Sequence, residues 1–123
     1  MSGFITFANS FENPQFNDVS DVDPKEVQEK KQSLKLIDVR QPDEFTGELG
    51  HIPGAELIVL NELPQKLNEL PRDQTIVFIC RSGNRSAQAT AFALENGFTS
   101  VYNMAGGMLR WNELNLETTE KNE

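Results

Sequence analysis

The sequence predicts an α/β domain of three layers, in which helices flank a central, mainly parallel, five-stranded sheet. Short apolar segments such as residues 75–79, rich in β-branched residues, alternate along the chain with segments of helical periodicity. The connections between them are short, which is typical of strands and helices wound around a mainly parallel sheet. A length of 123 residues favours one domain with one hydrophobic core.

The chain begins with an extension that has no clear period. Residues 1–15 include three Phe, two Asn and one Pro, and we expect either an added strand or a strap across the domain. Residues 16–20 alternate weakly and predict a short edge strand. Asp23 is a suitable N-cap for a helix over residues 24–31, because Pro24 stands at its first position.

The middle of the chain continues this alternation. Residues 34–39 and 55–60 are apolar segments that predict strands, and a glycine-rich loop lies between them. Residues 41–45 follow the first of these strands and predict a short helical turn. Leucines at helical spacing predict a helix over residues 61–70, capped by its first residue and ended by Pro71.

The last third contains the most regular pattern. The strand at residues 75–79 is followed by a polar turn and then by a helix that starts at Ser86 and ends near residue 96, before a glycine. Residues 100–103 predict the last strand, and residues 105–111 a short final helix. The remaining residues are polar and acidic, and we expect them to fray.

Composition excludes several classes of function. The net charge of −8 argues against nucleic acid and anionic membranes as partners. No apolar segment approaches the ~20 residues needed to cross a bilayer, and the first 16 residues lack the basic start of a secretory signal. A single cysteine forms no internal disulfide, so we expect a cytoplasmic protein.

That cysteine lies in the segment Cys80–Ser86, between the strand at residues 75–79 and the following helix. Backbone N–H groups in such a turn, together with the positive end of the helix dipole, form a site for an anion. The same field favours the thiolate. Cys80 is therefore the candidate nucleophile. The candidate anion-binding residues are the six that follow it: Arg81, Ser82, Gly83, Asn84, Arg85 and Ser86.

Other candidate residues have structural interpretations. Asp38 and Arg40 follow a neighbouring strand, so we expect a pair that stabilises the fold and orients the cysteine loop from behind. Ser86 is a candidate N-cap. His51 has no catalytic assignment, and one Cys and one His without ligand spacing make no metal site. Neither a metal nor another cofactor is expected.

Three stretches resemble the signatures of single-domain rhodanese-like sulfurtransferases, in the order that this family has them. They are Leu36–Arg40 with Glu44, Phe45 and Gly50–Ala55; then Cys80–Ser86; then Gly106 and Gly107 with Trp111. The resemblance covers residues 16–112. It leaves out the extension at residues 1–15 and the acidic tail at residues 113–123.

The resemblance implies a chemistry for Cys80. Its thiolate would take the outer sulfur of a small anionic donor such as thiosulfate and become a persulfide. A thiol or a protein acceptor would then remove that sulfur, giving ping-pong kinetics. Arg81 and Arg85 would attract the donor. We expect an exposed, shallow site that is suited to a protein partner.

Two alternatives stay open at this point. Cysteine phosphatases use a similar thiolate, but they need five residues between cysteine and arginine. Here only four separate Cys80 from Arg85, and Ser86 occupies the phosphatase position. The other alternative is a non-enzymatic sulfur carrier, or a redox-sensing or regulatory module, because a reactive thiolate is also open to oxidation.

Overall fold

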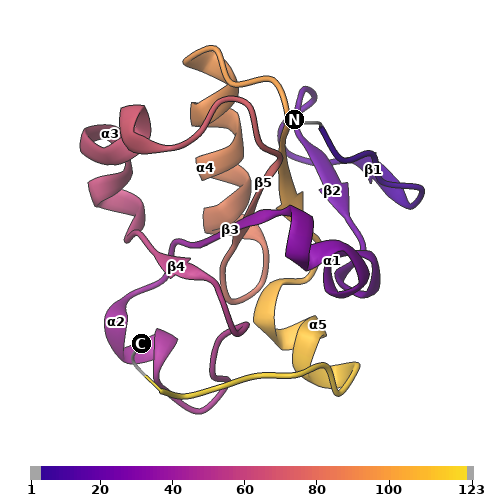
Figure 1. The fold of residues 1–123 in the computed structure, drawn as a ribbon, viewed down its shortest axis with the longest axis vertical. Coiled ribbons are helices and arrows are strands. Elements are labelled where there is room, and N and C mark those ends of the chain that lie inside the picture. The colour runs from indigo at the N-terminus through magenta and orange to yellow at the C-terminus, as the bar shows by residue number, and fades with distance from the viewer. Residues whose placement is uncertain (1–3, 122–123) are drawn as a thin grey trace.

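The computed structural model describes residues 4–121 and shows one sheet of six strands between two layers of helices (Figure 1). The strand order is β1-β2-β6-β5-β3-β4. Only the β1–β2 pair is antiparallel, and every other neighbouring pair is parallel. The predicted class is confirmed, whereas the predicted number of five strands was wrong. The strands are β1 (Ser10–Glu12), β2 (Ser20–Val22), β3 (Lys35–Asp38), β4 (Glu56–Leu57), β5 (Ile76–Ile79) and β6 (Val101–Met104).

The helices cover both faces of this sheet. Those described are α1 (Pro24–Lys30), α2 (Pro42–Phe45), α3 (Leu63–Lys66), α4 (Asn84–Glu95) and α5 (Gly107–Glu113), with 3-10 turns at Lys31–Ser33, Leu60–Glu62 and Leu67–Glu69. Side chains of α3 and α4 belong to one apolar cluster, and side chains of α1 and α5 to the other. None of the helices in residues 4–121 is both long and apolar enough to span a bilayer.

Strand β5 lies at the centre of the core, and all four of its residues are buried. Ile76 and Phe78 pack against the α3–α4 side, whereas Val77 and Ile79 pack against the α1–α5 side. A parallel strand covered on both faces is apolar at every position, which explains the unbroken apolar segment in the sequence. The residue after this strand, Cys80, is therefore held at a fixed point at the end of the core.

The sixth strand comes from the N-terminal extension. Asn13 makes a tight turn there, because its Oδ1 accepts the backbone N–H groups of Gln15 and Phe16. The turn brings β1 back beside β2 as a hairpin. The strand predicted at residues 16–20 was placed too early, since a second turn, in which the Val19 N–H donates to the Phe16 carbonyl at 3.1 Å, occupies most of that segment.

Two predicted elements are shorter than expected. The helix predicted over residues 61–70 is divided into α3 and two 3-10 turns, and Pro64 lies in the first turn of α3, where a proline is tolerated. The strand predicted over residues 55–60 pairs with β3 at only two residues before the chain turns at Leu60.

The segment after α5 does not fray as far as it is described. Thr119 and His51 exchange two backbone hydrogen bonds of 2.8 and 2.9 Å, and the Trp111 indole donates to the Glu117 carbonyl at 2.9 Å. Figure 1 shows this segment crossing from α5 towards α2. The expectation of a frayed tail was therefore wrong up to this point, and residues 122–123 lie outside the described part.

Candidate active site

Cys80 directly follows β5, and α4 begins four residues after it. Gly83 is the N-cap of this helix, with φ of 105° in the left-handed region that glycine adopts readily. The expectation that Ser86 caps the helix was wrong, because Ser86 is the third residue of α4. The tight turn at Gly83 starts the helix early and directs its first N–H groups towards the cysteine.

Three donor groups surround the Cys80 sulfur. The backbone N–H of Gly83 lies 3.1 Å from Sγ, the backbone N–H of Ser86 lies 3.4 Å away, and the Ser86 hydroxyl oxygen lies 3.2 Å away. Such groups at a helix N-terminus stabilise a negative charge on sulfur. Cys80 is only 1% exposed. The sulfur is thus recessed within its loop, and the expectation of an exposed, shallow site does not hold for the thiol itself.

Arg85 forms a two-pronged ion pair with Glu44 of α2. Both nitrogen–oxygen distances are 2.8 Å. This hydrogen-bonded pairing lowers the pKa of Glu44 to about 2 and raises the pKa of Arg85 above its usual value. The charge of Cys80 adds to the effect on Arg85. The second arginine of the loop is therefore held by a carboxylate and lies near enough to Cys80 to be affected by a negative charge on its sulfur.

Asp38 and Arg40 form a second ion pair, which is buried. Arg40 donates from Nε and Nη2 to the two oxygens of Asp38 at 2.9 and 2.8 Å, and Nη2 also donates to the Gly50 carbonyl at 2.8 Å. The two side chains are 1% and 0% exposed. These contacts agree with a pair that stabilises the fold. The predicted effect of this pair on the cysteine loop stays a prediction.

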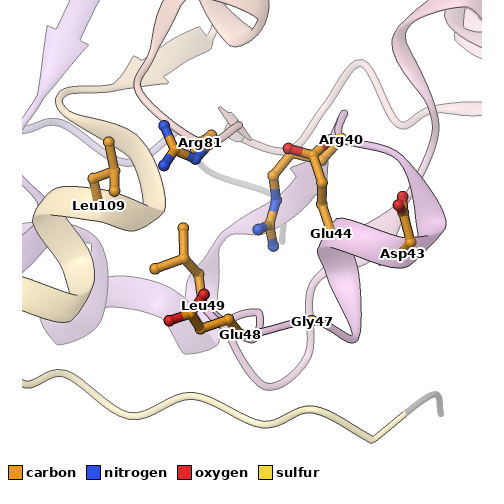
Figure 2. A pocket seen from close by; sticks show the side chains of 8 residues that line it. All are labelled: Arg40, Asp43, Glu44, Gly47, Glu48, Leu49, Arg81 and Leu109. Carbon is orange, nitrogen blue, oxygen red and sulfur yellow. The ribbon is translucent and has the colours of Figure 1, made fainter.

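Arg81 is exposed and lines an open cavity of about 450 Å³ beside the loop. Among the described ion pairs, none involves Arg81. Figure 2 shows Arg81 and Leu109 on one side of the cavity and the residues of α2 on the other. This guanidinium is therefore available to an incoming anion. The lining residues are Arg40, Asp43, Glu44, Gly47, Glu48, Leu49, Arg81 and Leu109.

On its other side, the loop borders a polar cavity of about 340 Å³. Ser82 and Asn84 are exposed there, and both line this cavity together with Gly83. Neither Ser82 nor Asn84 has a side-chain contact with the sulfur among those described. Their predicted part in anion binding would therefore come through the backbone of the turn.

A buried polar chain lies behind the loop. Ser86 Oγ donates to Asn103 Oδ1, and Asn103 Nδ2 donates to Asp21 Oδ1 at 3.0 Å and to the Gly83 carbonyl at 3.2 Å. Neither Asn103, Asp21 nor Glu44 was a candidate from the sequence. An Asn in a short strand gives no local signal of its partner, because Asp21 is 82 residues away in the chain.

Comparison with known families agrees with this geometry. The model of the rhodanese-like domain matches residues 23–114. The chain belongs to the rhodanese-like family. Its fold is that of a rhodanese-related protein from Thermoplasma volcanium, which has a TM-score of 0.77 and 29% identity, with 82% of this chain and 98% of that chain covered.

Several relatives of this rhodanese-like domain are named sulfurtransferases. The putative sulfurtransferase YtwF of Bacillus subtilis is 39% identical over 108 residues, which cover 88% of this chain and 99% of YtwF. The thiosulfate sulfurtransferase GlpE of Pseudoalteromonas translucida is 32% identical over 91 residues, covering 74% of this chain and 85% of GlpE. The protein YqhL of Bacillus subtilis is 43% identical over 77 residues, but the match spans only 60% of its length and 63% of this chain.

Proposed function

We propose that this rhodanese-like domain is a sulfurtransferase that carries a sulfane sulfur as a persulfide on Cys80. The observation that carries the proposal is the convergence of two backbone N–H groups and one hydroxyl on Sγ. These donors are fixed by the start of α4, so they need no rearrangement when negative charge develops. A neutral buried thiol requires no such set of donors.

The first half of the reaction loads the cysteine. The Cys80 thiolate attacks the outer sulfur of thiosulfate, a sulfur–sulfur bond forms, and the bond to the sulfonate group breaks. The electron pair of that bond leaves with sulfite, so a charge of −3 is kept on both sides. Arg81 attracts the doubly charged donor to the cavity beside the loop, because its guanidinium is exposed. The name of GlpE supports thiosulfate as the donor.

The second half unloads the cysteine. A nucleophile such as cyanide, a thiol or a protein acceptor attacks the outer sulfur of the persulfide and takes it. The electron pair of the breaking bond returns to Sγ, which becomes the thiolate again. The loop N–H groups then stabilise charge on sulfur in both states. A reducing compartment such as the cytoplasm suits this cycle, because it keeps the lone thiol free.

Phosphate transfer is a weaker candidate on this geometry. A phosphatase needs its loop arginine to contact the substrate, whereas Arg85 is bound by both oxygens of Glu44. The loop is also one residue shorter than a phosphatase loop. A sulfur carrier would use the same Cys80 cradle and differs in lacking turnover. A redox sensor would use the cradle for a thiolate that is oxidised.

Mass spectrometry tests the proposal. The protein is treated with thiosulfate, and we expect a gain of one sulfur atom on Cys80 that is lost when cyanide is added. Steady turnover of thiosulfate and cyanide to thiocyanate separates an enzyme from a carrier. Cys80→Ser is the control and is expected to lose at least a thousandfold in turnover while it stays folded. Phosphatase turnover equal to sulfur transfer, or no sulfur on Cys80, would overturn the proposal.

A further inference from the structure

The orientation of the Asn103 side chain is determined by its neighbours. Its amide nitrogen lies 3.0 Å from Asp21 Oδ1 and 3.2 Å from the Gly83 carbonyl, and both of these oxygens are acceptors. The nitrogen must therefore point towards them. The amide oxygen consequently faces Ser86 Oγ and can only accept a hydrogen bond from it. Asp21, Ser86 and Asn103 are all at least nine-tenths buried.

The Ser86 hydroxyl has two acceptors but a single proton. Asn103 Oδ1 lies on one side of Oγ, and Cys80 Sγ lies 3.2 Å away on the other. When the proton bonds Asn103, Oγ presents a lone pair to the sulfur and accepts from a neutral thiol. When the sulfur is a thiolate, the Ser86 hydroxyl donates its hydrogen bond to Sγ, because hydrogen bonds to ionised groups are roughly twice as strong.

Sulfur transfer moves the charge away from Sγ. In the thiolate the negative charge is on Sγ, whereas in the persulfide it is mainly on the outer sulfur. Ser86 Oγ is next to Sγ, so the Ser86 hydroxyl loses its charged hydrogen-bond acceptor each time the cysteine is loaded. A buried donor without an acceptor costs about 1–3 kcal/mol. Asn103 Oδ1 is placed where it can accept the hydrogen bond from the Ser86 hydroxyl instead.

We propose that Asn103, held by Asp21, is a positioning residue that gives the Ser86 hydroxyl a second acceptor in the loaded state. The proposal rests on the sulfur transfer assigned above to Cys80. In the thiolate, Ser86 donates to Sγ. In the persulfide and in the neutral thiol, it donates to Asn103. Asn103 therefore sets the balance between the thiolate and the two states in which Sγ is not charged.

The test is a double-mutant cycle on Ser86 and Asn103. In Asn103→Leu the Ser86 hydroxyl keeps only Sγ as a hydrogen-bond acceptor. The thiolate is therefore stabilised relative to the persulfide and the neutral thiol. At a fixed ratio of thiosulfate to sulfite, and at a pH where the unloaded Cys80 is ionised, we expect the ratio of persulfide to unloaded protein to fall about tenfold, measured by mass spectrometry of the intact protein. In a Ser86→Ala background, the same Asn103 substitution is expected to leave the ratio unchanged.

A purely structural role for Asn103 would lower the ratio equally in both backgrounds, and that result would overturn the proposal. Asn103→Thr provides a second variant, because Thr suits a strand and its shorter side chain withdraws the acceptor. Circular dichroism of each variant verifies the fold. An unchanged ratio in both single variants, with wild-type loading intact, would also overturn the proposal while sulfur transfer stands.

Alkylation by iodoacetamide supplies a measurement that does not depend on sulfur transfer. Because the thiolate gains in Asn103→Leu, we expect alkylation at mildly acidic pH to be several times faster than in the wild type, and this difference to vanish in the Ser86→Ala background. The charged groups around Cys80 are Arg85 on α4, the pair of Asp38 and Arg40 after β3, and Asp21 behind Asn103. The substitution replaces no charged residue, but it removes the Asn103 donor from Asp21, which keeps the hydrogen bond from Asn13 Nδ2 at 3.0 Å. The Ser86→Ala background controls for this change. Slower or equal alkylation would overturn the proposal even if thiosulfate proved not to be a donor.

Discussion

The carboxyl ends of β3 and β5 lie side by side in the sheet, yet they carry opposite kinds of polar site. At the end of β3, Asp38, the last residue of the strand, and Arg40 satisfy each other with two hydrogen bonds between side chains, and both are buried. After β5, Cys80 is equally buried, but two backbone N–H groups and a hydroxyl shared with Asn103 converge on its sulfur, a set that suits a negative charge. At the same edge of one sheet, complete pairing indicates a structural site, and donors that converge on one sulfur indicate a reactive one.

The two sites are also mechanically connected. Arg40 binds the Gly50 carbonyl, which ties the end of β3 to the loop that leads to β4. The backbone N–H of Val39 donates to the Ile79 carbonyl at 2.9 Å, so the ladder continues up to the residue before Cys80. The paired site therefore holds the strand end on which the reactive site depends. If this division is correct, substitutions at the two ends affect different measurements.

The largest effect on stability is expected at the β3 end. Asp38→Ala leaves the Arg40 guanidinium buried without its carboxylate, which we expect to lower the free energy of unfolding by about 3–5 kcal/mol. Urea unfolding measures this loss. Replacing both residues, as in Asp38→Leu with Arg40→Met, removes the uncompensated charge and should cost clearly less. A single variant that unfolds like the wild type but loses sulfur transfer would show that Asp38 belongs to the reactive site.

An intermediate effect is expected at Gly83. Its φ of 105° strains any other residue, and Gly83→Ala should cost roughly 1–3 kcal/mol of stability. A Cβ there would have its nearest contact at 3.5 Å, so backbone strain dominates. The N–H that points at Sγ should move as this strain relaxes, and turnover should fall about tenfold or more.

Gly54 supplies the matched control for this substitution. Its φ is 92°, and a Cβ at this position would meet nothing within 4 Å. Gly54→Ala should therefore lose a similar amount of stability without any change in turnover per folded molecule. Thermal unfolding and thiocyanate formation measure the two quantities separately. Equal losses of turnover in both variants would mean that the donors around Cys80 have no special part.

The sequence was sufficient to predict the parts of the fold and site that depend on local pattern. The apolar segment at β5, the turn and the helix after it place Cys80 correctly, because strand burial and helical periodicity are local properties. The predicted helix start at Ser86 was two residues late, since Gly83 caps α4. For residues 1–15 the sequence left an added strand and a strap as alternatives, and it did not predict that β1 pairs with β2 as a hairpin. Its strand β1 is exposed and has no apolar alternation, and its turn depends on hydrogen bonds of Asn13.

The partners of the loop were not predictable for a different reason. Glu44 finds Arg85 across 41 residues, and Asn103 connects Ser86 to Asp21 from a different strand. A capping box explains Glu44 locally, so nothing in the sequence indicated its second role. The first pairing depends on the position of α2 beside the start of α4, and the second on the pairing of β2 with β6, which only the assembled fold determines.

The smallest expected effect concerns the pair of Glu44 and Arg85, which lies at the reactive end but is itself a paired site. Its hydrogen bonds to Arg85 hold the pKa of Glu44 at about 2, below the usual 4.5. The pair therefore stabilises the fold fully above about pH 4.5, and this contribution is lost as the pH falls towards 2. Because the Arg85 side chain is 35% exposed, solvent screening limits the effect to about 1 kcal/mol. Arg40 is only 1% exposed, so the Glu44 pair should contribute clearly less than the Asp38 pair.

Glu44→Gln tests this contribution without changing the size of the side chain. The difference in the free energy of unfolding between wild type and variant should be near 1 kcal/mol at pH 7 and should shrink towards zero near pH 2. Other carboxylates with lowered pKa values, such as Glu26, are present in both proteins and cancel in the difference. A difference that stays constant over this range would show that Glu44 stabilises the fold through packing. The ion pair with Glu44 would then contribute no stability, and Arg85 would be a second arginine available to the sulfur donor.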